Sequence, residues 1–212
     1  MTGSTIHLDY LFNLHKMKDR NNLLIQLRQF AKANKIPIID EITADFYSQI
    51  LQISKPKLLL EIGTAMGFSA ILAAQCLSTD AQIFTVEKSI DNIKLARENF
   101  AKFDIHSKIE LLEGDAKQIL PSLNRNFDFI FLDADKQDYL ELLPLIIDNL
   151  QAGGILFVDN LLWKGEVADF SKKLRKAGVE ILREFNIQFI KHAKLNSTIL
   201  PIGDGVGLAI KI

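Results

Sequence analysis

The decisive stretch of this chain is Phe129-Ile130-Phe131-Leu132-Asp133-Ala134-Asp135-Lys136, in which an apolar run turns abruptly acidic. A short apolar run bounded by turn residues is typical of a strand buried in a parallel sheet. The same pattern returns in Ile155-Leu156-Phe157-Val158-Asp159-Asn160. Ligands of open α/β sheets bind beyond the carboxyl ends of the strands, so two neighbouring strands would bring Asp133, Asp159 and Asn160 to one edge.

These three side chains predict a metal site. They offer oxygen atoms, which are the ligands that a hard divalent cation such as Mg2+ prefers. Asp and Asn also end strands and cap turns without binding anything, and either cluster alone favours that simpler interpretation. The two clusters together, with Lys136 beside them, favour a catalytic site that binds Mg2+.

Length and composition indicate one domain with a sizeable core, since the chain has 212 residues, is 48% hydrophobic and carries a net charge of −1. Such a charge balance gives no global attraction to nucleic acid or membrane, but it leaves room for a local basic patch. No apolar stretch approaches the roughly 18 residues of a membrane span, and the polar N-terminus has no signal-peptide region. Cys76 is the only cysteine, so no disulfide framework is expected. We expect a cytoplasmic protein without membrane partners.

Apolar runs and helical spacing alternate along the chain, which predicts a parallel, doubly wound α/β sheet. The expected strands are 57–62, 82–87, 108–113, 127–132 and 154–159, and the expected helices between them are 67–78, 89–102, 115–122 and 136–150. A long polar helix is expected at 166–192. Two further strands, 198–202 and 206–211, flank Gly203-Asp204-Gly205, which is a hairpin signal.

Helical spacing also marks residues 20–34 and 41–53, before the first strand. The expected single domain, 1–212, therefore divides into an N-terminal helical cap, 1–53, and a Rossmann-like core, 54–212. No repeat, low-complexity tract or linker interrupts it.

The ends of the first three strands predict a nucleoside site. Gly63 and Gly67 after the first strand lack the G-x-G-x-x-G spacing of pyrophosphate binding. Glu87 ends the second strand, where an acid accepts from both ribose hydroxyls. Asp115 and Ala116 follow the third strand, where a carboxylate can accept from an adenine amino group and a backbone N–H is available. Each acid alone is an ordinary surface residue or cap, but together they favour S-adenosylmethionine over NAD.

At this point the chain resembles the cation-dependent O-methyltransferases of the class I S-adenosylmethionine fold, the group with caffeoyl-CoA and catechol O-methyltransferases. The resemblance covers nearly the whole chain. Its motifs are Ile36-Pro37-Ile38, Phe131-Leu132-Asp133-Ala134-Asp135-Lys136, Asp159-Asn160-Leu161-Leu162-Trp163-Lys164-Gly165 and Pro201-Ile202-Gly203-Asp204-Gly205. The resemblance implies a mostly parallel seven-stranded sheet with a C-terminal antiparallel hairpin and extra N-terminal helices, and a homodimer in which those helices supply the contact.

The resemblance also implies the roles of individual residues. It assigns the metal to Asp133, Asp159 and Asn160. It assigns the lining of the cofactor pocket to Ile38, Glu61, Gly63, Thr64, Ser69, Glu87, Ala116 and Asp133.

The chemistry follows from the methyl donor. A sulfonium methyl is already electrophilic, so the enzyme must supply an oxyanion in line with it. Mg2+ favours the anion of a bound hydroxyl, and an octahedral ion held by three protein oxygens leaves room for two adjacent substrate oxygens. Lys136 is the expected general base, because a partly buried lysine near a cation has a lowered pKa. The alternative is a solvated lysine, or one paired with Asp135 or Asp138.

The substrate should carry vicinal oxygens, as a catechol and 5-hydroxyuridine both do. The short chain and the Pro-Ile-Gly-Asp-Gly ending resemble bacterial tRNA 5-hydroxyuridine methyltransferases most. A basic cluster that fits tRNA phosphates, or else an ordinary solvated helix face, is formed by Lys164, Lys172, Lys173, Arg175 and Lys176, with His15, Lys16, Lys18 and Arg20 as its extension. Trp163 is expected either to stack on a base or to pack a lid.

tRNA is therefore the leading expectation for the partner, and a small catechol-like substrate is the alternative. A third possibility, a non-catalytic nucleoside-binding module, is disfavoured by the intact set of Asp133, Lys136, Asp159 and Asn160.

Overall fold

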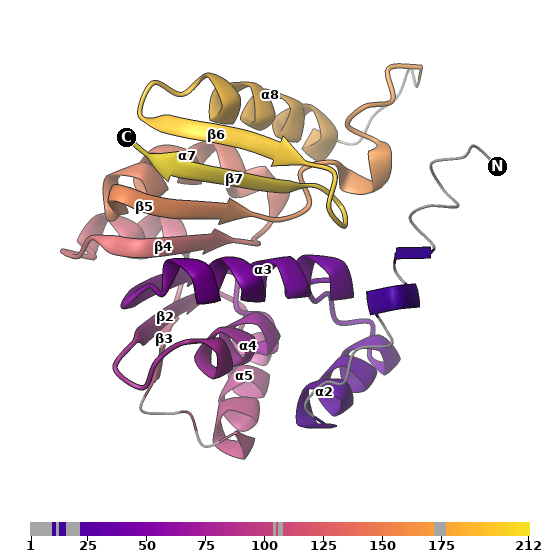
Figure 1. The fold of residues 1–212 in the computed structure, drawn as a ribbon, viewed down its shortest axis with the longest axis vertical. Coiled ribbons are helices and arrows are strands. Elements are labelled where there is room, and N and C mark those ends of the chain that lie inside the picture. The colour runs from indigo at the N-terminus through magenta and orange to yellow at the C-terminus, as the bar shows by residue number, and fades with distance from the viewer. Residues whose placement is uncertain (1–9, 12, 16–21, 104, 106–107, 172–176) are drawn as a thin grey trace.

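The computed structural model describes residues 10–11, 13–15, 22–103, 105, 108–171 and 177–212. Within this part of the chain, seven strands form one sheet in the order β3-β2-β1-β4-β5-β7-β6 (Figure 1). The strands are β1 (Leu58–Ile62), β2 (Gln82–Glu87), β3 (Ile109–Glu113), β4 (Phe127–Leu132), β5 (Leu150–Val158), β6 (Leu195–Leu200) and β7 (Val206–Lys211). β1 to β5 pair in parallel, and β7 runs antiparallel to both β5 and β6. This confirms the predicted fold class, including the C-terminal hairpin.

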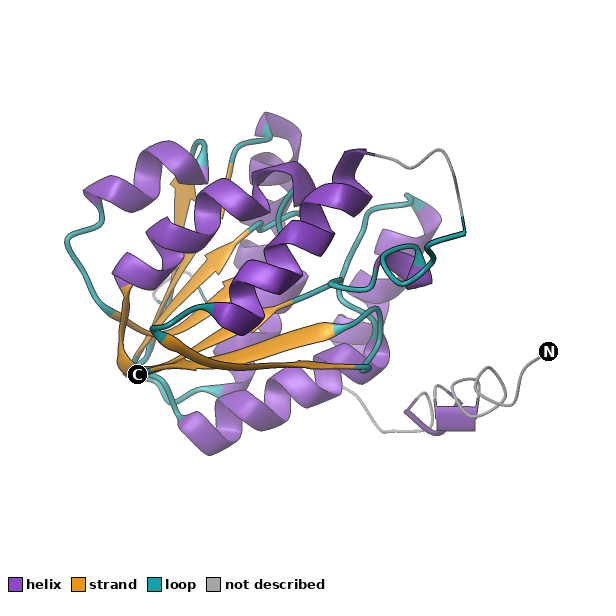
Figure 2. Ribbon diagram, turned by 90° about the horizontal axis from the view of Figure 1, so that it is seen from above, coloured by secondary structure: helices purple, strands orange, loops and turns teal. Residues whose placement is uncertain are grey.

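Helices cover both faces of the sheet (Figure 2). They are α2 (Asn22–Ala33), α3 (Glu41–Ser54), α4 (Phe68–Cys76), α5 (Ile90–Lys102), α6 (Ala116–Ile119), α7 (Tyr139–Asn149) and α8 (Ala177–Lys191). Short 3-10 turns lie at η1 (Leu120–Ser122), η2 (Lys136–Asp138) and η3 (Trp163–Gly165). The helices α2 and α3 pack into the same hydrophobic cluster as β1, so the N-terminal segment shares the core of the sheet.

Successive residues of each central strand point to opposite faces, as the pleat of a strand requires. The face toward α3, α4 and α5 takes Leu59, Ile83, Phe129, Phe131 and Phe157, and the face toward α7 and α8 takes Leu60, Phe84, Ile130, Leu132 and Val158. This two-sided burial explains why the strands are continuous apolar runs in the sequence.

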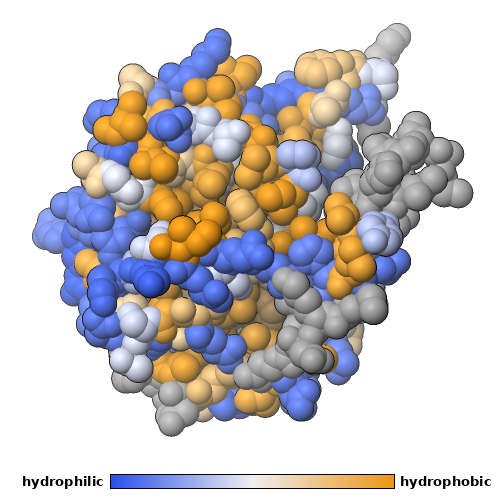
Figure 3. Space-filling view, viewed as in Figure 1, coloured by the Kyte–Doolittle hydropathy of each residue, from blue (hydrophilic) through white to orange (hydrophobic). Residues whose placement is uncertain are grey.

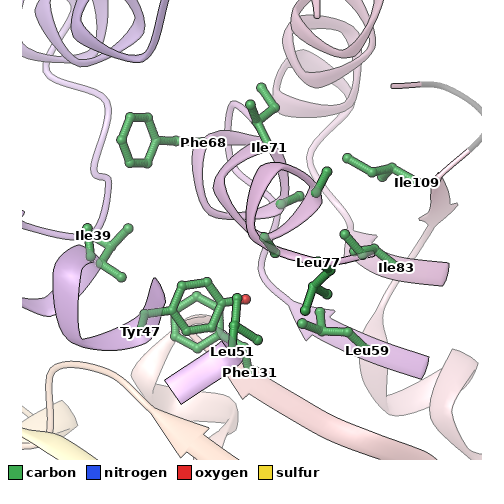
Figure 4. Packing of buried hydrophobic residues seen from close by; sticks show 14 of the residues in the cluster. Ile39, Tyr47, Leu51, Leu59, Phe68, Ile71, Leu77, Ile83, Ile109 and Phe131 are labelled. Carbon is green, nitrogen blue, oxygen red and sulfur yellow. The ribbon is translucent and has the colours of Figure 1, made fainter. Parts of the chain in front are cut away.

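Tyr47 is the centre of the cluster on the α3 face, where it lies beside Leu51 and over Phe131 (Figure 4). The rings of Tyr47 and Phe131 have centroids 4.8 Å apart. An aromatic pair of this kind adds about 0.5–1.5 kcal/mol to the gain from burial. The contact fixes α3 against β4, the strand that leads to Asp133.

Several elements differ in extent from the prediction, and three of these differences affect β5, β6 and the loop after β5. β5 begins at Leu150 rather than 154, because a shift in its pairing with β4 carries the strand through Gly153, whose φ is +78°. β6 ends at Leu200, since Pro201 has no N–H for the ladder.

The long helix expected at 166–192 begins at Ala177. Residues 159–171 form a loop instead, in which Leu161 N–H donates to the Gly205 carbonyl at 2.9 Å and Leu162 N–H donates to the Asp204 carbonyl at 2.9 Å. The loop after β5 is thereby held against the turn of the hairpin.

Candidate active site

A cavity of about 450 Å³ opens at the carboxyl edge of the sheet, among the loops that follow β1 to β5 and the segment before α3. It brings together nearly all the residues predicted from the sequence. Its wall includes Ile38, Gly63, Thr64, Ser69, Glu87, Asp115, Ala116, Asp133, Lys136, Asp159 and Asn160. Of the predicted site residues, Glu61 is the exception.

Glu61 lies below the cavity rather than in its wall. Its side chain is 0% exposed and accepts a hydrogen bond from the Thr85 hydroxyl, which in turn lies 2.6 Å from the Thr64 hydroxyl. Burial raises the pKa of Glu61 to about 7, against the opposing effect of hydrogen bonds from Ser69 and Thr85. The expected lining role is therefore corrected: Glu61 supports Thr64 and Ser69, which do face the cavity.

Glu87 is held by backbone amides at the end of β2. Its Oε2 accepts from the N–H of Ala65 at 2.8 Å, and its Oε1 accepts from the N–H of Lys88 at 3.0 Å and of Ser89 at 2.9 Å. A carboxylate has about four acceptor sites, so these three bonds leave capacity for a ligand hydroxyl. The carboxylate is fixed before any ligand arrives.

Asp115 has the same character at the end of β3. Its Oδ1 accepts from Lys117 N–H at 2.9 Å, which caps α6. The capping role and the place in the cavity wall are combined in one side chain.

Gly63 allows the loop after β1 to touch the end of β4. Its φ is +100°, and a Cβ at this position would lie 2.0 Å from the carbonyl oxygen of Asp133. No other residue type fits this approach without displacing the backbone. Gly63 thus brings the loop after β1 against the end of β4, which carries Asp133.

Asp133 and Asp159 follow neighbouring strands in matched register. Leu132 of β4 pairs with Val158 of β5, and the N–H of Asp159 donates to the Leu132 carbonyl at 3.0 Å. Adjacent strands lie about 4.8 Å apart, so the two acids are side by side. Asn160 has a φ of +61°, which Asn tolerates better than most residues, and its N–H donates to Asp159 Oδ1 at 2.7 Å.

Asp159 is the least satisfied of these groups. Its side chain is almost fully buried, and burial and the neighbouring Asp133 raise its pKa to about 8. Among the described residues, its Oδ2 has no hydrogen-bond partner. A buried carboxylate oxygen in this state is costly unless a ligand takes it.

The donor set of Asp133, Asp159 and Asn160 fits a hard cation, because all three side chains present oxygen. Within the described part of the chain, no group of three His, Cys, Asp or Glu residues forms a metal cluster. The amide oxygen of Asn160 is therefore needed to complete a three-ligand set.

Lys136 is held as an ammonium group. Its Nζ donates to Asp133 Oδ1 at 3.1 Å, to the Ala134 carbonyl at 3.2 Å and to the Tyr139 hydroxyl at 2.6 Å. Burial acts to lower the pKa of Lys136, but Tyr139 and Asp133 raise it by more. The direction is opposite to the one expected for a base, because that expectation assumed a cation beside Asp133.

The contact of Tyr139 with Lys136 was not predicted from the sequence. Its ring is fully buried, and its hydroxyl donates to the Asp159 carbonyl at 3.2 Å. Tyr139 thus links Lys136 to the β5 end. Its spacing of one helical turn from Lys136 could have indicated the contact. An aromatic residue at the start of an apolar helix, however, more often belongs to the hydrophobic core.

The predicted lysine pairings are also different. Among the described residues, Lys136 forms its ion pair with Asp133 and not with Asp135 or Asp138. Asp138 pairs with Lys88 and Lys117 instead. Lys88 and Asp138 both line the cavity, and no sequence pattern distinguishes them from other surface charges.

The basic cluster can be followed only at Lys164, which is exposed. The other members, Lys172, Lys173, Arg175 and Lys176, lie outside the described residues, as do Lys16, Lys18 and Arg20.

Two further predicted residues, Trp163 and His15, contact helices of the fold. Trp163 packs on α8, where a Cβ at Gly178 would lie 2.3 Å from its ring. Nδ1 of His15 lies 2.5 Å from Asp45 Oδ2 on α3.

Comparison with known proteins places the chain in a family. Residues 15–212 match the O-methyltransferase family. The chain is 34% identical over 178 residues to caffeoyl-CoA O-methyltransferase 3 of Nicotiana tabacum, which covers 79% of this chain and 73% of that relative. A candidate caffeoyl-CoA O-methyltransferase from Staphylococcus aureus has a TM-score of 0.88 at 29% identity, over 98% of this chain and 100% of that one. An O-methyltransferase from Bacillus cereus in complex with SAH has a TM-score of 0.84 at 25% identity, over 96% of each chain.

The chain therefore belongs to the O-methyltransferase family, and it is an S-adenosylmethionine-dependent enzyme. In the part of the chain that the structure describes, no helix is long and apolar enough to span a membrane.

Proposed function

We propose that the chain is a Mg2+-dependent O-methyltransferase that methylates one of two vicinal oxygens on a small catechol-like acceptor. The observation that carries this proposal is the buried Asp159 Oδ2, which lacks a partner among the described residues and lies beside Asp133 at the edge of the sheet. In the proposed site this oxygen would be a ligand of a cation, and the cation would also bind the two adjacent oxygens of the acceptor.

The cofactor half of the cavity suits S-adenosylmethionine. The fixed carboxylate of Glu87 is the proposed acceptor for the ribose hydroxyls, and Asp115 and Ala116 are the proposed contacts of the adenine. Ile38 and Ser69 also line the cavity and are proposed contacts of the rest of the cofactor. Because backbone amides already hold Glu87 and Asp115, these side chains lose little conformational entropy when the cofactor binds.

The metal half would be formed by Asp133, Asp159 and Asn160. A bound Mg2+ favours the anionic form of a substrate hydroxyl, which is the form that attacks a sulfonium methyl. The chain's own residues then have two tasks. Asp133 and Asp159 hold their carboxylates side by side, and Lys136 keeps Asp133 oriented through its 3.1 Å bond.

Lys136 has two proposed roles that can be separated. As a general base it must give up a proton that three acceptors now hold, so its pKa must fall when the site is loaded. As an electrostatic partner it only needs its charge. The variant Lys136→Arg keeps the charge but removes a usable base, whereas Lys136→Met removes both. Activity in Lys136→Arg well above that of Lys136→Met would exclude the base role.

The small acceptor is supported by the relatives, which include caffeoyl-CoA O-methyltransferases. The tRNA substrate remains a prediction from the sequence, because most of its basic cluster lies outside the described residues. Lys164 is the member that can be located, exposed and with its N–H bonded to Asp204 Oδ1 in the hairpin turn.

The test offers both substrates to the enzyme with labelled S-adenosylmethionine and Mg2+. One arm contains caffeoyl-CoA and a panel of catechols, and the other contains hypomodified tRNA. Transfer to the small acceptors alone supports the proposal. Transfer to tRNA alone, with a log–log salt slope of roughly −0.7 to −0.9 per phosphate contact, would replace it.

The lysine cluster provides the matched variants. Replacing Lys172, Lys173 and Lys176 with Gln should raise KM and flatten the salt slope only if tRNA is the substrate. Lys57, exposed and on the opposite edge of the sheet, gives the control variant Lys57→Gln.

A homodimer is proposed as the assembly, with α2 as the contact. Ile25 and Phe30 on α2 are 37% and 45% exposed. A second apolar surface lies over β5 and β7 (Figure 3), where Ile210 is 45% exposed. Light scattering should find a dimer that Phe30→Asp breaks and Ile210→Asp leaves intact. A dimer broken only by Ile210→Asp would move the contact to the sheet.

A further inference from the structure

A cluster of charges joins the segments after β2 and β4 to α6, beside the cavity. Asp138 accepts from Lys88 Nζ at 3.0 Å through Oδ2 and from Lys117 Nζ at 2.8 Å through Oδ1. Lys117 also lies 3.5 Å from Glu141 Oε2. Lys88 and Asp138 line the cavity, yet neither has a part in the chemistry proposed above.

The position of the cluster in the sheet is what suggests a function. Lys88 follows β2 and Asp138 follows β4, and the sheet order places β1 between these two strands. The ion pair therefore links the two strand ends on either side of β1. Lys117 comes from α6, beyond β3, so the cluster extends across the cofactor half of the edge.

Both carboxylate oxygens of Asp138 accept hydrogen bonds from the two lysines. It precedes α7 but makes no side-chain cap bond to that helix. Burial acts to raise the pKa of Asp138, but hydrogen bonds from Lys117 and Lys88 lower it by more, so it is ionised at neutral pH. Its side chain is 17% exposed, against 54% for Lys88 and 31% for Lys117. The acid is the inner member of the cluster, and the lysines reach it from the solvent side.

We propose that Asp138, Lys88 and Lys117 form an ionic clasp that closes over the bound cofactor and slows its release. The proposal rests on S-adenosylmethionine occupying this cavity, as argued above. Asp138 is a positioning residue in this scheme, because it acts by holding two loops together. Partly exposed ion pairs are individually weak, so the expected effect is a several-fold change in rate.

The test measures dissociation of SAH from the full chain by stopped-flow. Asp138→Asn and Lys88→Met should each raise the dissociation rate by about three- to tenfold, with association little changed. The double variant should dissociate no faster than the faster single variant, since both changes break the same contact. Additive effects of the two changes would contradict a direct pairing.

Salt provides a readout that a merely structural role would not move. The wild-type dissociation rate should rise with added NaCl, because screening weakens the exposed pairs, and the rate of Asp138→Asn should respond much less. The matched control is Asp80→Asn, which breaks an exposed ion pair with Lys57 away from the cavity and should leave SAH dissociation unchanged.

The failures can be told apart. A wild type that does not bind SAH would remove the cofactor from this cavity, and the clasp with it. A wild type that binds SAH, with Asp138→Asn folded and unchanged in both rate and salt response, would overturn the clasp alone. Thermal melting of each variant without SAH confirms that it is folded.

Discussion

Two acids in one half of the sheet's carboxyl edge, Glu87 and Asp115, contrast with Asp159 in the other half. In the cofactor half, Glu87 accepts hydrogen bonds from backbone amides of the loops after β1 and β2, and Asp115 accepts one from the segment after β3. In the metal half, Asp159 is nearly as buried as any core residue, yet one carboxylate oxygen has no partner among the described residues. The carboxylates of Glu87 and Asp115 are thus held by the protein without a ligand, whereas that of Asp159 is not fully held.

The difference indicates where the fold gives up stability for function. Backbone amides that hold Glu87 also close the turns after β1 and β2, so the same bonds serve the fold and the site. The carboxylate of Asp159 does not stabilise the fold in this way, because burial and Asp133 disfavour its charged form and raise its pKa to about 8. Removing the carboxylate of Glu87 should therefore lower the free energy of unfolding, and removing the charge of Asp159 should raise it.

The largest effect is expected from Asp159→Ala. It should reduce methyl transfer by about a thousandfold, because a metal's contribution to charge stabilisation is several kcal/mol. The measurement is transfer of labelled methyl to caffeoyl-CoA. Asp128→Asn, on β4 at the end far from the cavity, is the control and should retain activity. Comparable activity in Asp159→Ala and Asp128→Asn would remove Asp159 from the mechanism.

Glu87→Ala should weaken SAH binding by about tenfold to a hundredfold, because buried ribose hydroxyls lose an acceptor worth about 1–3 kcal/mol. It should also lower the free energy of unfolding, since three backbone amides lose their acceptor. Calorimetry and urea unfolding measure the two effects. An unchanged affinity would leave Glu87 as a structural acid only.

Asp159→Asn should do the reverse and stabilise the metal-free protein by roughly 1–3 kcal/mol at pH 8. A raised pKa means that the folded state holds a proton that the unfolded state releases. Wild-type stability therefore falls as pH rises from about 4 to the folded pKa of about 8, and the variant lacks this loss.

The advantage of Asp159→Asn should accordingly grow between pH 4 and pH 8 and level off above. Urea unfolding in EDTA across this range is the measurement. Glu61, whose pKa is raised to about 7, contributes the same trend to both proteins and cancels in the comparison. A constant difference at every pH would show that Asp159 does not titrate as described.

The smallest effect is expected from Asp115→Asn. Asn caps helices as well as Asp, so stability should change by less than about 0.5 kcal/mol. SAH binding should weaken by only about two- to fivefold, because the amide oxygen still accepts but carries no charge. A much larger loss, measured by calorimetry, would mean that the charge of Asp115 matters to the cofactor.

Much of this edge could be predicted from the sequence because strand ends are marked by abrupt changes in polarity. Phe131-Leu132-Asp133 and Phe157-Val158-Asp159 each give the strand, its end and the candidate ligand together. Parallel pairing then requires the two acids to be neighbours, which the register of β4 and β5 bears out.

Other features depend on contacts between distant segments, which no local pattern records. Glu61 lies near the end of a strand, where a side chain was expected to line the cavity, but it is fully buried. The pKa of Lys136 depends on Tyr139 and Asp133 at once. The loop after β5 is held by hydrogen bonds from Leu161 and Leu162 to Gly205 and Asp204, which lie far along the chain.

The central claim is that Asp133, Asp159 and Asn160 hold a divalent cation on which methyl transfer depends. The direct measurement is transfer of labelled methyl from S-adenosylmethionine to caffeoyl-CoA in EDTA, before and after Mg2+ is restored. We predict no transfer above background in EDTA and full recovery with Mg2+, but no recovery in Asp159→Ala. Full activity in EDTA would contradict the claim.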